Sequence, residues 1–181
     1  MHKRNIYNMV IAALLCAVGI VIPLISPIRI LIEPASFTLA SHVAIFIAMF
    51  ISPLTALFVG AGTTLGFFFA GFPIPVVARA ASQLVFLTIG SLILSKKPEY
   101  IKQPLKTAIF AAFLSVIHGL CEVLVVIPFY FGGNLSALTY EKGFLYSVVL
   151  LVGVGTFIHS MLDFYIALYI WKPLQKIRKK A

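Results

Sequence analysis

Ionisable and polar side chains inside long apolar runs are the residues of this chain that could do chemistry. Three pairs of them are spaced four residues apart: Arg79 with Gln83, His118 with Glu122, and His159 with Asp163. Residues at this spacing lie on one face of an α-helix, so the members of each pair can act together. Charged groups inside a bilayer are costly and usually face a protein interior or a cavity, so all three pairs are candidate functional groups.

A histidine beside a carboxylate could bind a metal ion or take part in catalysis. The sequence has no HExxH, GxSxG or Walker A motif, and Cys16 and Cys121 lack metal-ligand spacing. Paired histidine and acidic groups on a helix are more often a hydrogen-bonded packing feature. We therefore expect no catalytic residue, no metal, no cofactor and no hydrolysis of ATP by this chain.

The arginine indicates a different chemistry, the binding of an anion. A guanidinium in a dry pocket can hold a carboxylate by two parallel hydrogen bonds, and Gln83 adds an amide one helical turn from Arg79. The alternative is an ion pair between Arg79 and Glu122 that only neutralises both groups. The two interpretations overlap, because such a pair can open for a ligand.

The elements that must position these residues are membrane-spanning helices. The chain has 181 residues, of which 61% are hydrophobic and only 10% are charged, and its mean hydropathy is +1.08. A soluble domain carries about 25% charged residues, so most of this chain is solvated by lipid. We expect an all-α membrane protein in which residues 1–181 form a single transmembrane substrate-binding domain.

Six apolar runs are candidate spans, since a bilayer needs about 20 residues per helix. They cover about 6 to 26, 37 to 52, 53 to the turn AGFPIP, 74 to 95, 107 to 131 and 144 to 171, the second being short. The sequence therefore predicts six transmembrane helices in a compact bundle.

The net charge of +9 reports topology rather than nucleic-acid binding, because eleven of the fourteen lysines and arginines fall in three segments. These residues are Lys3, Arg4, Lys96, Lys97, Lys102, Lys106, Lys172, Lys176, Arg178, Lys179 and Lys180. Basic residues that flank spans collect on the cytoplasmic side. Six spans place all three segments on one side, so we expect both termini in the cytoplasm.

Depth along the predicted helices decides which polar groups can meet. Arg79 and His42 lie roughly 8 Å below the outer ends of their spans, and Gln83 and Glu122 roughly 14 Å below theirs. These four residues could line one outward-opening pocket, and His118 lies one turn deeper than Glu122 on the same face.

The first span carries a stripe of small residues in AALLCAVG. Ala13 and Ala17 are four residues apart, a spacing that lets another helix approach closely. That helix could belong to a partner protein or to this chain.

A basic, six-span chain of this length with such a stripe resembles the S-component, the substrate-binding subunit, of energy-coupling factor (ECF) vitamin transporters. The run EPASFTLASHVAIFIAMFISPLTALFVGAGTTLGFFFAG adds to the resemblance, which covers essentially the whole chain. It implies a high-affinity vitamin binder in the bacterial cell membrane that docks, here through Ala13 and Ala17, on a transmembrane coupling protein driven by two ATPase subunits. It also implies a ligand site near the outer face, built by spans four to six. The loop PIRILIEPASF would cap this site, with Arg29 and Glu33 closing over the ligand.

The identity of the vitamin stays open at this point. Arg79 favours an anionic vitamin, and the many hydroxyl and amide partners favour pantothenate; nicotinate would use the same arginine and the abundant aromatic side chains. Pyridoxine or hydroxymethylpyrimidine would instead use Glu122 and the histidines. The expected substrate-binding residues are Arg79, Gln83, Glu122, His42, Arg29 and His118.

The sequence gives less support to two other classes of protein. A solitary proton-coupled carrier could use His118, Glu122, His159 and Asp163 as a proton relay, but the chain shows no inverted repeat. An intramembrane hydrolase lacks any supporting motif.

Overall fold

The structure is a computed structural model that describes residues 2–178, without the side chains of residues 2–5, 29, 31 and 176–178. Its α-helices are α1 (His2–Ile25), α2 (Val43–Ile51), α3 (Pro53–Phe69), α4 (Ile74–Lys96), α5 (Pro104–Phe131), α6 (Ala137–Glu141) and α7 (Gly155–Arg178). A 3₁₀ turn, η1 (Pro98–Ile101), joins α4 to α5, and a π-helical segment, η2 (Leu145–Val154), runs directly into α7. Two strands, β1 (Arg29–Ile32) and β2 (Ala35–Thr38), follow α1.

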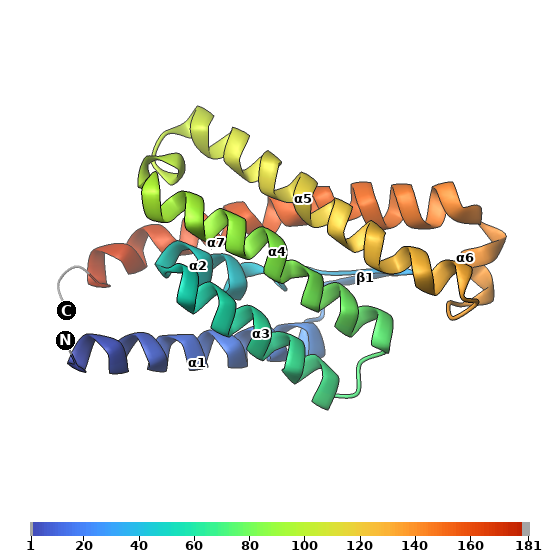
Figure 1. The fold of residues 1–181 in the computed structure, drawn as a ribbon, viewed down its shortest axis with the longest axis horizontal. Coiled ribbons are helices and arrows are strands. Elements are labelled where there is room, and N and C mark those ends of the chain that lie inside the picture. The colour runs from blue at the N-terminus through green and yellow to red at the C-terminus, as the bar shows by residue number, and fades with distance from the viewer. Residues whose placement is uncertain (1, 179–181) are drawn as a thin grey trace.

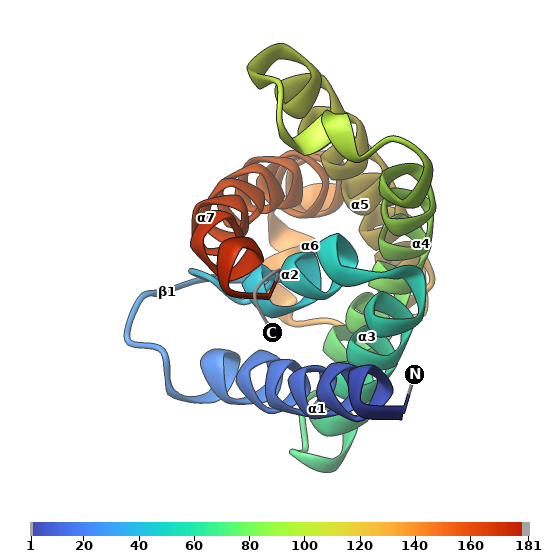
Figure 2. The same ribbon diagram turned by 90° about the vertical axis from the view of Figure 1, so that its left-hand side faces the viewer.

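The long helices run back and forth along the long axis of the molecule. The N- and C-terminal ends of the described chain lie at the same end (Figure 1). Viewed along this axis, α1, α3, α4, α5 and α7 surround the short helix α2 (Figure 2). The bundle therefore has one central helix that its neighbours enclose.

Within residues 2–178, four helices are long and apolar enough to cross a bilayer. They span Ile6–Ile25, Ile74–Lys96, Pro104–Phe131 and Leu145–Gln175, and α3 is a shorter apolar helix. The expectation of an all-α membrane protein is confirmed at this level. Each of the six predicted segments contains a helix. Six full spans are not confirmed, because α2 and α3 fall short of the required length.

The second predicted span is where sequence and structure differ most. Residues 37 and 38 belong to β2, and α2 has only nine residues, about 14 Å of helix, against the roughly 30 Å of a hydrocarbon core. Every side chain from Val43 to Phe50 is buried, and α2 contacts α1, α3, α4 and α7. This segment is apolar all round because protein encloses it.

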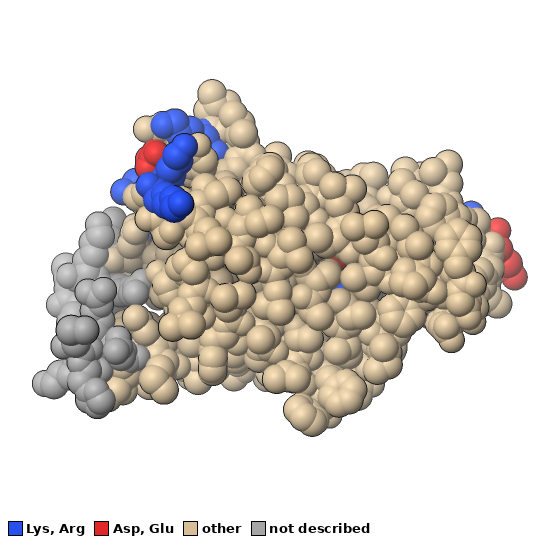
Figure 3. All heavy atoms as spheres, in the orientation of Figure 1, with Lys and Arg blue, Asp and Glu red and all other residues tan. Residues whose placement is uncertain are grey.

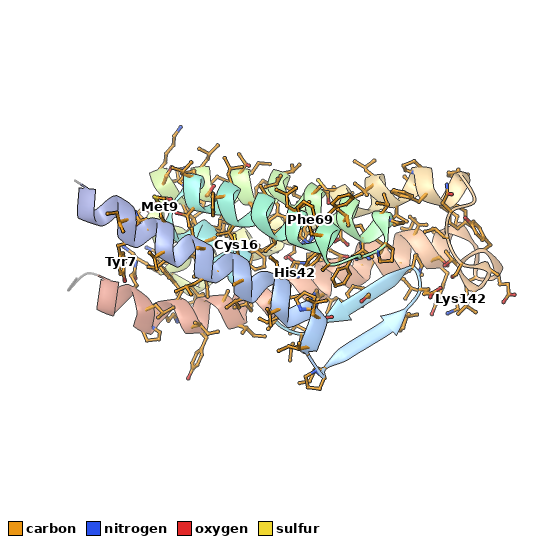
Figure 4. The ribbon with its side chains drawn as sticks, turned by 90° about the horizontal axis from the view of Figure 1, so that it is seen from below. Tyr7, Met9, Cys16, His42, Phe69 and Lys142 are labelled. Carbon is orange, nitrogen blue, oxygen red and sulfur yellow. The ribbon has the colours of Figure 1, made fainter. Side chains whose placement is uncertain are left out.

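The predicted loop before α2 is a β-hairpin. Its strands pair antiparallel with Arg29 opposite Thr38 and Ile32 opposite Ala35, and the Glu33–Pro34 peptide bond at the turn is cis. The strand β2 contacts α7 and η2, so the hairpin lies along the bundle, with His42 near the end that leads into α2 (Figure 4). The hairpin thus brings backbone and side chains from the first connection to the polar residues of α4, α5 and α7.

Charged side chains gather at the two ends of the molecule, and the broad surface between them on this face shows only one small charged spot (Figure 3). Lys96, Lys97, Lys102 and Lys106 are exposed around η1, and Glu141 and Lys142 are exposed near α6. This distribution suits a bilayer around the middle of the bundle. The assignment of the terminal end to the cytoplasm remains a prediction.

The stripe of small residues on α1 faces outward. Ala13 and Ala17 are exposed, whereas Ala12 and Gly19 are buried and Cys16 packs against α3. A Cβ atom added at Gly62 of α3 would lie only 2.6 Å from the Cys16 sulfur, so a different face of α1 makes the close approach within this chain. Ala13 and Ala17 are therefore left free on the surface of the isolated chain.

Candidate binding pocket

A pocket lies in the half of the bundle away from the termini. Its wall draws on the late part of α1, strand β2, the start of α2, the late part of α3, the early part of α4, and α5 and α7, and it holds about 740 Å³ of empty space, its open mouth included. Its polar wall includes Ser41, His42, Arg79, Gln83, Glu122 and His159. A concave, mostly apolar wall with a small number of convergent polar groups is typical of a site for a small molecule.

The strongest polar contact in the pocket is an ion pair between Arg79 of α4 and Glu122 of α5. The Arg79 guanidinium donates from Nη2 to Glu122 Oε2 at 2.7 Å and from Nε to the same oxygen at 3.1 Å. A third, longer hydrogen bond runs from Nη1 to the carbonyl oxygen of Pro34 in the hairpin, at 3.4 Å. Arg79 is 8% and Glu122 is 2% exposed, so a pair that excludes most water links two helices and the hairpin.

Glu122 is also held from α5 and α7. Thr156 donates its hydroxyl to Oε2 at 2.6 Å, so three donors gather on one carboxylate oxygen. The other oxygen, Oε1, lies 3.4 Å from Nε2 of His118, one turn away on the same helix. That nitrogen makes no hydrogen bond, while His118 Nδ1 lies 3.2 Å from the Ser160 hydroxyl.

A second polar cluster ties α7 to the start of α2. The carboxylate of Asp163, which is fully buried, accepts the backbone N–H of Ala40 at 2.9 Å and that of His42 at 2.8 Å. The His42 side chain adds a contact from Nδ1 at 3.1 Å, and His159 Nε2 lies 3.3 Å from the same carboxylate. Asp163 therefore fixes the turn in which Ala40 has a positive φ of 67°, and with it the place of His42.

The two clusters meet where the His42 ring packs against the His118 ring. The second ring nitrogen of His42, Nε2, lies 3.1 Å from Nε2 of Gln83, and the His42 ring packs edge-on against the His118 and His159 rings at 4.9 Å. With Nδ1 protonated toward Asp163, Nε2 of a neutral His42 accepts from the Gln83 amide. A chain of polar contacts thus runs from Gln83 through His42 to Asp163, and the His42 ring meets the Arg79–Glu122 cluster at the ring of His118.

The rest of the pocket wall is apolar and aromatic. Phe37 of the hairpin packs against His159 with ring centroids 5.5 Å apart, and Phe67 and Phe72 stack on each other at 4.7 Å. All three phenylalanines line the pocket. Flat aromatic surfaces beside a guanidinium suit a ligand with a planar ring and an anionic group.

The structure brings together most of the predicted binding residues. Arg79, Gln83, Glu122 and His42 line the same pocket, and His118 lies behind Glu122 without reaching the wall. The side chain of Arg29 lies outside the described residues, and the hairpin contributes Ser36, Phe37 and Thr38 to the wall. The pocket is lined by α1, α2 and α3 as well as by α4, α5 and α7, whereas the resemblance implied a site built by spans four to six.

Sequence reasoning missed two contributors to the pocket wall. Ser41 and Thr156 carried no signal, since single hydroxyl residues are common in any helix or turn. His159 and Asp163 were recognised as a pair, but nothing in the sequence indicated that Asp163 would bind the backbone before α2. Such a contact depends on how helices far apart in sequence pack.

Two sets of side chains have donor atoms within 4.8 Å of one another, close enough to suggest a metal ion: His42 with His118 and Glu122, and His42 with His159 and Asp163. A hydrogen bond joins His42 to Asp163 in the second set, whereas the three members of the first set share no hydrogen bond with one another. The expectation that this chain binds no metal stays a prediction.

Replacing Asp163 with asparagine is expected to destabilise the protein. An amide in place of the carboxylate loses charge-assisted hydrogen bonds and turns N–H groups toward the donors of residues 40 and 42, a loss of about 1.5–3 kcal/mol. Melting in detergent should fall by several degrees, whereas Tyr165→Phe, at a largely exposed position on the same helix, should melt like the parent. Equal melting of Asp163→Asn and the parent would show that Asp163 does not anchor this turn.

A buried ion pair and a polar network around a pocket, inside a bundle of apolar helices, define a multi-pass membrane protein with a site for a small molecule. No family model matches the chain, and no solved structure matches it. The chain is 43% identical over 175 residues to the "Niacin transporter NiaX" of Lactococcus lactis subsp. cremoris (strain MG1363), an alignment that covers 96% of this chain and 77% of that protein. The chain therefore belongs to the family of this transporter, and it is a membrane transport protein.

Proposed function

We propose that this chain is the vitamin-binding subunit of an ECF-type importer and that its ligand is niacin in its anionic form, nicotinate. The observation that carries the proposal is the buried guanidinium of Arg79 on the wall of the pocket, in a chain whose relative is named a niacin transporter. Nicotinate, the alternative ligand in the sequence analysis, thereby replaces pantothenate as the preferred one.

Nicotinate fits the chemistry of the pocket on both of its sides. Its carboxylate matches the planar fork of Arg79, and its flat pyridine ring matches the aromatic wall of Phe37, Phe67 and Phe72. The ring nitrogen is an acceptor, and the Gln83 amide and the Ser41 hydroxyl are donors on the same wall. Pantothenate has no aromatic ring, so the three phenylalanines would pack against a flexible polar chain instead of a flat ring.

The proposal includes partner proteins, because the sequence has no nucleotide-binding loop of its own. A transmembrane coupling protein would dock on the exposed stripe of Ala13 and Ala17, and two ATPase subunits would drive the transport cycle. Small residues on a lipid-facing helix allow the backbone of a partner helix to approach closely. With the basic end of the bundle in the cytoplasm of a bacterial cell, the pocket lies in the outer half of the plasma membrane.

Binding selectivity tests the proposed ligand. Nicotinamide has nearly the shape of nicotinate but no charge, so we expect it to bind at least about tenfold more weakly, the loss of one charge-assisted contact. Pantothenate should not compete at concentrations that saturate nicotinate binding. Isothermal titration of the purified chain in detergent, without ATP, measures all three. Equal affinity for nicotinate and nicotinamide, or tighter binding of pantothenate, would contradict the assignment.

A further inference from the structure

The buried groups around the pocket do not carry the positive charge that an anionic ligand would need. The charged and titratable groups in the pocket wall or directly behind it, within the described residues, are Arg79 on α4, His118 and Glu122 on α5, His42 before α2, and His159 and Asp163 on α7. With neutral histidines these groups sum to one negative charge. A bound carboxylate would bring the total to two, among side chains that are all buried.

Arg79 alone cannot neutralise the charge of the ligand, because its guanidinium already donates two hydrogen bonds to the carboxylate of Glu122. If the ligand takes over the guanidinium, Glu122 loses both contacts and is left as a buried carboxylate with Thr156 as its remaining donor. A buried charge without a partner is strongly unfavourable, so the exchange needs a new cation for Glu122.

His118 is placed to supply that cation. Its Nε2 is one of three buried side-chain polar atoms without a hydrogen-bond partner in the described part of the chain, and it lies 3.4 Å from Glu122 Oε1. The ring is fully buried between Phe86, at a centroid distance of 4.4 Å, and His42. A proton on Nε2 would face an oxygen that a small rotation of either side chain brings into hydrogen-bond geometry.

We propose that the pocket binds its anionic ligand together with one proton, which His118 takes up at Nε2. The ligand carboxylate replaces Glu122 on Arg79, and Glu122 keeps Thr156 and turns Oε1 to the His118 imidazolium. The proton comes from solvent, and in the resulting imidazolium both ring nitrogens are donors, Nε2 toward Glu122 and Nδ1 toward the Ser160 hydroxyl. The complex then carries one more positive charge to match the anion that entered. This inference rests on the proposed binding of nicotinate.

The other histidines are less suited to this role. His42 stands between Asp163 and Gln83, with a contact at each ring nitrogen. His159 Nε2 lies 3.1 Å from the Ser41 hydroxyl and 3.3 Å from Asp163. Neither His42 nor His159 lies on α5, the helix that carries Glu122. Glu122 is the group that loses its partner, and His118 is one turn from it on that helix.

Titration calorimetry with nicotinate, in two buffers of different ionisation enthalpy at the same pH, counts the protons taken up on binding. We expect close to one proton per ligand between about pH 7 and pH 8, where an unperturbed histidine is mostly neutral. One proton taken up also means that the dissociation constant rises roughly tenfold for each pH unit in this range. Nicotinate itself stays anionic over this range, so the ligand contributes no such dependence.

Three variants assign the proton. His118→Gln keeps a hydrogen-bonding side chain but cannot be protonated, so binding should take up no proton and should lose its dependence on pH. Glu122→Gln removes the carboxylate that needs the proton and should also abolish uptake, with an affinity that no longer weakens as pH rises. His159→Gln should still take up close to one proton, whatever its affinity. Cys121→Ala, next to Glu122 on α5 and half-buried, is the control for folding and binding.

The outcomes separate this inference from the proposed function. Binding of nicotinate by the parent chain without proton uptake overturns the inference and leaves the ligand assignment standing. Undiminished uptake in His118→Gln overturns the role of His118, and should that variant fail to fold, undiminished uptake in Glu122→Gln overturns the exchange instead. Failure of the folded parent chain to bind nicotinate at all overturns both proposals.

Discussion

Replacing Arg79 with alanine is expected to weaken nicotinate binding about ten- to a hundredfold. The change removes a charge-assisted contact to the carboxylate, and a hydrogen bond to a charged group contributes about 1.5–3 kcal/mol. Arg79→Lys should recover only part of the affinity, because an ammonium group cannot match the planar fork of a guanidinium. Titration of nicotinate into the purified variants in detergent measures the effect.

The double variant Arg79→Ala/Glu122→Gln separates ligand binding from stability. If Arg79 serves only as the counter-ion of Glu122, the single variant leaves a buried carboxylate unpaired, and Glu122→Gln restores both melting temperature and affinity. Our account expects the double variant to recover melting temperature but not affinity. Full recovery of both would make Arg79 a structural residue and would remove the reason for an anionic ligand.

Tryptophan at Ala13 or at Ala17 is expected to abolish transport without affecting ligand binding. A bulky side chain on the exposed stripe of α1 prevents a partner helix from approaching, whereas the described α1 residues that line the pocket are Gly19 and Pro23. Uptake of labelled nicotinate into vesicles that contain the chain, the coupling protein and both ATPases should fall to the background of vesicles without the chain.

Leu14→Trp is the matched control, because this position is 61% exposed on the same helix and already carries a large side chain. It should transport like the parent. Transport at the parental level by both Ala13→Trp and Ala17→Trp would show that the stripe is not the docking face. Strong uptake by the chain alone, driven by a proton gradient, would contradict the partner proteins and favour a solitary carrier.

The sequence predicted the long helices and the polar wall of the pocket well, because both follow from local properties. Hydropathy locates α1, α4, α5 and α7, whose apolar faces meet lipid. Depth along a helix is linear in residue number, so the meeting of Arg79, Gln83, Glu122 and His42 could be predicted from their distances to the helix ends. The Arg79–Glu122 ion pair, one of the two interpretations of Arg79 in the sequence analysis, is present in the structure.

The remaining features depend on packing between distant segments. Hydropathy cannot distinguish a helix that lipid surrounds from one that protein surrounds, so α2 was predicted as a span. The hairpin before it gave no clear alternation, and its antiparallel register is visible only with both strands in place. The choice of pantothenate over nicotinate likewise rested on counts of polar residues, whereas selectivity depends on which of them share a wall with aromatic rings.

The most direct test of the account is the identity of the small molecule that accompanies the protein from the cell. The chain would be expressed in a bacterium, purified in detergent and denatured, and the released ligand identified by mass spectrometry, with Arg79→Ala prepared in parallel. The account predicts nicotinate at close to one molecule per parent chain and much less with the variant. Release of pantothenate, or of a neutral molecule retained equally by Arg79→Ala, would contradict the claim that Arg79 binds the carboxylate of niacin.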